Sequence, residues 1–100
     1  MQTINFEEYD EVKLRKFTVI SRLIDSDIKS CEVPNILYFN KLYNLDLKDN
    51  NMLDLIELIK LSNYFEHTEY INICKHFALI YKDMPQEEIE KLLKTVTNKI

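Results

Sequence analysis

The sequence predicts a small α+β domain in which a three-stranded sheet is edged by helices. Two observations support this fold class. Apolar residues alternate with polar residues over residues 2–15, and from Phe17 onward they recur with a helical period. The chain has 100 residues, which is the size of one domain, and its composition of 46% hydrophobic and 30% charged residues is typical of a folded globular protein.

The first predicted element is a β-hairpin over residues 2–15. Apolar and polar residues alternate on both sides of a polar break at residues 8–10, a pattern typical of a hairpin with one buried face. A short third strand is predicted over residues 30–33. The apolar residues of the hairpin pattern are Ile4, Phe6, Val12 and Leu14.

Helices are predicted for most of the remaining chain. The first covers about residues 17–24, and Asn35 is a suitable N-cap for a second over about residues 36–44. Residues 52–65 are apolar around most of a helix circumference, which predicts a central helix buried on more than one side. A further helix is predicted over about residues 69–82, with one stripe formed by Tyr70, Cys74, Phe77 and Tyr81.

The last predicted helix covers about residues 84–97. Asp83 and Gln86 match the spacing of a capping box, and Pro85 is tolerated in a first helical turn. The apolar residues of this helix form one stripe, made of Ile89, Leu92, Leu93, Val96 and Ile100.

Composition excludes several classes of function. The chain contains no glycine, so it has none of the glycine-rich loops that bind phosphates and no Gly-x-Ser-x-Gly nucleophile motif. A net charge of −4 argues against binding to nucleic acid. No apolar run is long enough for a transmembrane helix, and the N-terminus has no pattern of a secretory signal. We therefore expect a protein of the cytoplasm, the nucleus or both, with no membrane partner.

The residues that could carry chemistry do not form a known constellation. Cys31, His67, Cys74 and His76 lack the paired spacing of a structural zinc site. A Cys/His nucleophile pair could only be assembled by the fold, and Cys74 lies in the middle of a predicted helix, where no helix N-terminus stabilises a thiolate. We therefore expect a protein that is not an enzyme and that has no catalytic residues, metal ion or cofactor.

The second half of the chain resembles a known family. Residues 55–65 (LIELIKLSNYF) are similar to a family segment of the form LFELILAANYL, and residues 74–78 and 87–89 continue the likeness. This family is the Skp/elongin-C group of BTB/POZ-fold adaptors, and the resemblance is greatest to the Skp adaptor of cullin–RING (SCF) ubiquitin ligases. Weaker similarity covers residues 18–23 and 33–36. The chain departs from the family in lacking tryptophan and most of the acidic loop before residue 33.

The resemblance implies a BTB/POZ-like core over residues 1–83 and a C-terminal helical extension over residues 84–100 that binds an F-box. It implies a non-enzymatic adaptor that bridges an F-box protein to a cullin. By position, Asn63 and Tyr64 correspond to family residues that contact the cullin. The positions that correspond to the F-box groove are Leu55, Ile56, Ile59, Cys74, Phe77, Ile89, Leu92, Leu93 and Val96.

An alternative interpretation keeps the fold without cullin binding. The chain would then be an interaction module or scaffold, for example a kinetochore-like scaffold, a viral decoy or a self-associating domain. In either case the apolar content of so short a chain predicts that the protein forms a homodimer when it lacks its partner.

Overall fold

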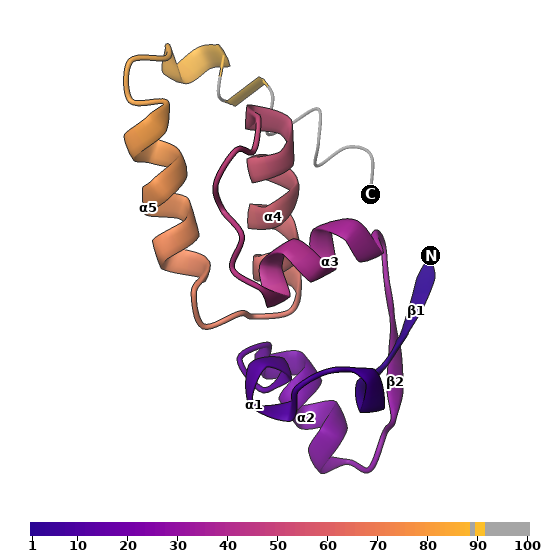
Figure 1. Ribbon diagram of the computed structural model, residues 1–100. Helices are drawn as coiled ribbons and strands as arrows, with labels where there is room; N and C mark the ends of the chain where they lie inside the picture. Colours follow the sequence, from indigo (N-terminus) through magenta and orange to yellow (C-terminus); the bar gives the residue numbers. More distant parts are fainter. Residues whose placement is uncertain (89, 92–100) are drawn as a thin grey trace.

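A computed structural model (Figure 1) describes residues 1–88, 90 and 91, and it confirms a small α+β domain. Residues 86–88, 90 and 91 are helical. The named elements, in chain order, are β1 (Gln2–Asn5), the short 3₁₀ helix η1 (Phe6–Glu8), α1 (Glu11–Leu14), α2 (Thr18–Asp25), β2 (Ser30–Val33), α3 (Ile36–Tyr43), α4 (Met52–Tyr64) and α5 (Tyr70–Ile80).

The sheet differs from the sequence prediction. In the described part of the chain it has two strands, β1 and β2, which run antiparallel with Ile4 opposite Cys31. The predicted hairpin over residues 2–15 and the three-stranded sheet are therefore wrong, whereas the predicted strand over residues 30–33 is confirmed as β2. Ile4 and Val33 lie on the same face of this sheet and are buried in the core.

Two local caps explain why the chain leaves the sheet after β1. The side chain of Asn5 accepts a hydrogen bond from the backbone N–H of Glu7 at 3.2 Å and begins η1. The side chain of Asp10 accepts from the N–H of Val12 at 2.8 Å and begins α1. Side-chain bonds of this kind compete with strand pairing for the backbone N–H groups. Here the chain forms helical turns after β1 instead of continuing as a strand.

The predicted helices of the middle of the chain are confirmed, with small shifts of their ends. α2, α3, α4 and α5 lie where the helical periods placed them. The side chain of Asn35 accepts from the N–H groups of Leu37 and Tyr38, as expected of an N-cap. α4 is central, since it packs against both α3 and α5 and buries five of its residues.

The start of the last helix differs from the prediction. Helical backbone begins at residue 86, so Asp83 lies too far upstream to cap it. The side chain of Gln86 instead donates forward to the carboxylate of Glu90 at 3.2 Å. The residues predicted for the stripe of this helix, Ile89, Leu92, Leu93, Val96 and Ile100, lie outside the described residues.

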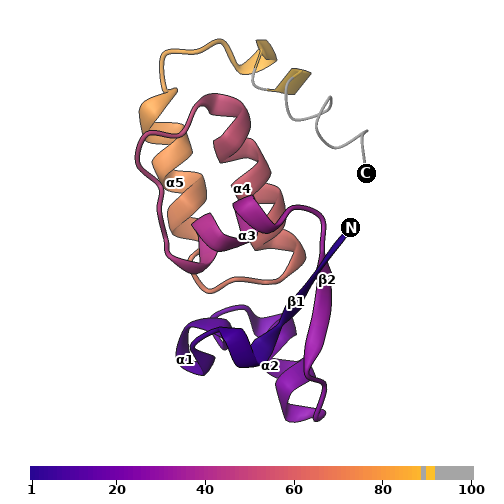
Figure 2. The same cartoon turned by 45° about the vertical axis from the view of Figure 1, so that its right-hand side comes forward.

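The core is built around stacked and edge-on aromatic rings. Phe17 stacks on Phe39 with a centroid distance of 4.9 Å and meets Phe65 edge-on at 5.9 Å. These three residues come from the segments before α2, within α3 and after α4, so the aromatic cluster joins both halves of the chain. Figures 1 and 2 show α4 and α5 side by side at one end of the molecule and the sheet with α1 and α2 at the other.

Helices α2, α3 and α4 end in the same way although the chain has no glycine. Each is followed by a residue in the left-handed region of φ: Asp27 (63°), Leu45 (53°) and Glu66 (52°). In each case the next residue donates its N–H to a carbonyl five residues back, which completes a Schellman motif. These bonds run from Ile28 to Leu23 (3.0 Å), from Asp46 to Lys41 (2.8 Å) and from His67 to Ser62 (2.8 Å).

Candidate interaction surface

The connection between α4 and α5 places two predicted site residues on the surface. We call the segment from Ser62 to Ile71 the α4–α5 corner. Asn63 is exposed, and the side chain of Tyr64 is 66% exposed, although the next residue, Phe65, is buried in the core. The rings of Tyr64 and Phe65 meet edge-on at 4.9 Å, so the buried ring supports the exposed one.

A shallow hollow of about 260 Å³ lies beside these two residues. Asn63 forms part of its wall, and the side of Tyr70 and the exposed Ile71 close it toward α5. The hollow combines polar side chains with one aliphatic residue. Its lining residues are Ser62, Asn63, Glu66, His67, Thr68, Tyr70 and Ile71.

Backbone hydrogen bonds hold the α4–α5 corner against the start of α2. The segment around residues 65–68 pairs with residues 16–19, and an isolated β-bridge joins Phe17 to His67. Arg22 adds an ion pair to the carboxylate of Glu66 at 2.6 Å, whose exposure limits its contribution to stability. The backbone bonds run from Thr18 to Glu66 (3.2 Å), from Val19 to Phe65 (3.1 Å) and from Thr68 to Lys16 (2.9 Å).

His67 is the buried polar residue of the corner. Its side chain is only 4% exposed, and its ring meets Phe17 edge-on at 4.6 Å. The backbone N–H of Glu69 donates to Nδ1 of His67 at 3.0 Å, which a neutral imidazole can accept and an imidazolium cannot. Burial lowers the pKa of His67 below its usual value, and Lys16 lowers it further against the opposing charge of Glu69.

The residues assigned to an F-box groove by the resemblance lie at different depths. Leu55 and Ile56 have no exposed surface, because α4 packs them into the core, so in this structure they offer nothing for a partner to touch. Phe77 is almost fully buried, and Ile59 and Cys74 are half-buried. The other assigned residues, Ile89, Leu92, Leu93 and Val96, lie outside the described residues.

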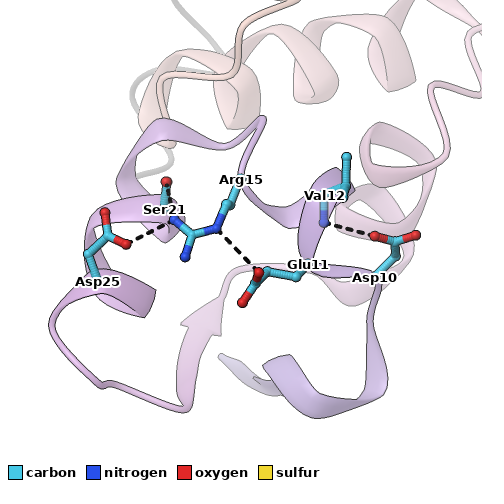
Figure 3. Close-up of polar contacts among 6 residues, drawn as sticks. All are labelled: Asp10, Glu11, Val12, Arg15, Ser21 and Asp25. Carbon is cyan, nitrogen blue, oxygen red and sulfur yellow. Dashed lines mark hydrogen bonds and ion pairs between the residues drawn. The ribbon is translucent and has the colours of Figure 1, made fainter.

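A second hollow lies among the N-terminal elements, and the sequence reasoning missed it. It has a volume of about 520 Å³ and is lined by η1, α1 and the turn before β2. Arg15 is one of its lining residues. Its guanidinium is bonded to Asp25 at 2.9 Å and to Ser21 at 3.1 Å, both on α2, and lies close to Glu11 on α1 (Figure 3). The spacing of Glu11 and Arg15 is that of an i,i+4 helix pair and could have been recognised in the sequence, whereas the bonds to Ser21 and Asp25 join two elements and follow no motif.

The two cysteines form no disulfide. Cys31 and Cys74 are free thiols. Burial raises the pKa of Cys31 to about 11, so this thiol is protonated at neutral pH and is a poor nucleophile. Within residues 1–88, 90 and 91, no three His, Cys, Asp or Glu side chains are grouped closely enough to hold a metal ion.

The fold and these surfaces define a small α+β domain whose α4–α5 corner presents an exposed aromatic side chain on a firmly held turn. Comparison with family models, with curated proteins and with solved structures finds no match for this chain. In the described part of the chain, none of the helices has the length and apolar character needed to span a bilayer.

Proposed function

We propose that this protein is a non-enzymatic adaptor of the Skp/elongin-C type that bridges an F-box protein to a cullin in a ubiquitin ligase of the cytoplasm or nucleus. The observation that carries the proposal is the exposure of Asn63 and Tyr64 on the α4–α5 corner. Tyrosine is enriched in the energetically important positions of protein interfaces, and a large exposed ring beside a hollow is a suitable anchor.

The BTB/POZ-like fold is part of this proposal. The order of elements from α2 to α5 supports it, because a short strand lies between the first long helix and the helical half. The two-stranded sheet counts against it, because a three-stranded sheet was expected.

The F-box side of the proposal rests on α4, α5 and residues 84–100. Ile59, Cys74 and Phe77 lie on the two packed helices and retain partial or slight exposure. An F-box helix that packs along α4 and α5 would extend the hydrophobic core around α4. It would not form a second, separate core.

The cullin face can be tested with one double variant. Asn63→Lys together with Tyr64→Ala should weaken binding to a cullin N-terminal domain by about tenfold or more, since loss of a central aromatic anchor costs about 2 kcal/mol. Binding to an F-box peptide should be unchanged. Calorimetric titration of both partners measures the two affinities.

The matched control is Leu37→Ala on α3, which removes a side chain of similar exposure far along the chain from the corner. A double variant that binds the cullin domain as tightly as the parent protein would contradict the proposed cullin face. F-box binding by a parent protein that has no affinity for the cullin would favour the second candidate, an interaction module without cullin binding. The two-stranded sheet is the observation that favours this candidate.

A further inference from the structure

The side of α5 that faces away from α4 is exposed and partly apolar. Four exposed residues of α5 share this side at helical spacing, and a fifth lies just after the helix. They are Ile71, Lys75, Ala78, Leu79 and Lys82. Ile71 is 59% exposed and Leu79 is 70% exposed. We call these five residues the outer face of α5.

The inner side of α5 is already used. Ile73 and Phe77 are buried in the core, and Tyr81 packs against it. Figures 1 and 2 both show α5 at the edge of the molecule, with α4 along one side of it. The outer face therefore presents apolar side chains that the packing of α5 on α4 does not require.

The two charged residues of this face are both lysines, although Glu69 lies just before the helix and Asp83 just after Lys82. From residue 70 to residue 82 the sequence contains Lys75 and Lys82 and no aspartate or glutamate, although the whole chain has a net charge of −4. Among residues 1–88, 90 and 91, neither of these lysines belongs to an ion pair. A partner that covers Ile71 and Leu79 must therefore supply the carboxylates that these two ammonium groups lack.

We infer that the outer face of α5 is a docking surface for an acidic amphipathic helix of another protein. Apolar side chains of that helix would cover Ile71, Ala78 and Leu79, and its glutamates or aspartates would pair with Lys75 and Lys82. The inference does not depend on the proposed adaptor function, because it uses neither Asn63 nor Tyr64 and none of the residues assigned to the F-box. Ile71 also lines the hollow beside Asn63, so it is the one residue that the two surfaces share.

Two other occupants fit less well. In an antiparallel pair of two copies, Lys75 would lie near Leu79 of the other copy, and neither helix has a carboxylate to pair with the lysines. A membrane surface would be favoured by aromatic anchors on the exposed side, but none of the five residues of the outer face is aromatic.

The test uses two synthetic helical peptides with the same leucines along one face, one with glutamates along both edges of that face and the other with lysines in their place. We expect the glutamate peptide to bind the full chain, by fluorescence anisotropy, with an affinity that falls as salt is raised. Lys75→Glu and Leu79→Glu should each weaken this binding by about tenfold or more. Leu37→Glu is the matched control, because Leu37 is 69% exposed on α3, and it should leave the affinity unchanged.

Every other outcome overturns the inference. Equal binding of the lysine peptide would show that charge does not select the partner, and equal loss with Leu37→Glu would show that the site is elsewhere. Absence of binding by the glutamate peptide would show that no such surface exists. Binding only to vesicles of phosphatidylcholine and phosphatidylserine would assign the face to a membrane, and self-association abolished by Leu79→Glu would assign it to a second copy. Lys75→Glu keeps the test valid if Leu79→Glu fails to fold.

Discussion

Replacing His67 should remove a pH dependence from the stability of this protein. In the folded state, Nδ1 of His67 accepts a hydrogen bond from the N–H of Glu69, and burial favours the neutral ring. In the unfolded chain the same ring titrates near its ordinary pKa of 6.5. The folded-state pKa is lower, so below pH 6.5 the unfolded chain binds more protons than the folded chain does.

The direction and the slope of the pH dependence of stability follow from this difference in proton binding. The contribution of His67 to the free energy of unfolding is fully present above about pH 6.5 and is lost as the pH falls from there toward the lowered pKa of the folded state. One proton of difference gives a slope of up to about 1.4 kcal/mol per pH unit. Most carboxylates titrate below about pH 5, so the window just below 6.5 is largely free of their contribution to the slope.

Urea unfolding between about pH 7.5 and about pH 5.5 measures this slope. His67→Asn keeps an acceptor close to the position of Nδ1 but does not titrate, so it should flatten the slope in this window. It should also lower the free energy of unfolding at every pH, because the edge-on contact with Phe17 is lost. His76→Asn, on α5, is the control for the loss of an imidazole elsewhere in the chain. An equal slope in the parent and in His67→Asn would refute the reasoning.

Three further changes have defined outcomes. Leu45→Gly relieves a left-handed residue and should leave the free energy of unfolding in urea unchanged or raise it, whereas Leu37→Gly within α3 should lower it by about 1 kcal/mol; equal losses would contradict this. Leu92→Asp should abolish F-box binding without loss of circular dichroism, and an unfolded variant would place this residue in the core. The free chain should self-associate in light scattering and melt at a higher temperature with an F-box peptide; a stable monomer with unchanged melting would contradict this.

Helical periods predicted the middle of the fold well, because each of these helices buries a stripe that the sequence alone displays. Asn35 could be recognised as a cap for the same reason, since its amide acts on the two N–H groups that follow it. Of the first fifteen residues, only the strand over residues 2–5 was predicted correctly. Alternation suggested a strand, but the side chains of Asn5 and Asp10 bond to the local backbone and start helical turns there.

The candidate surface was only partly visible in the sequence. The pair at residues 63 and 64 was found through a family-like segment, and the structure places both on the surface. The same segment suggested Leu55 and Ile56 as residues of an F-box groove. The sequence cannot distinguish this role from core packing, because an apolar residue of a central helix suits both. In the structure these two residues are buried in the core. The outer face of α5 was missed, because Ile71 and Leu79 add to a helix that is apolar around much of its circumference.

The three Schellman turns without glycine have a consequence for the unfolded chain. Glycine is the residue that loses the most conformational freedom on folding, so a chain without it has fewer unfolded conformations to give up. The left-handed Asp27, Leu45 and Glu66 each oppose folding by about 1 kcal/mol of native strain. The absence of glycine therefore lowers the entropy of unfolding along the whole backbone and concentrates a modest enthalpic cost at three helix ends. Calorimetry should therefore give an entropy of unfolding per residue below the usual ~2.1 cal/mol/K.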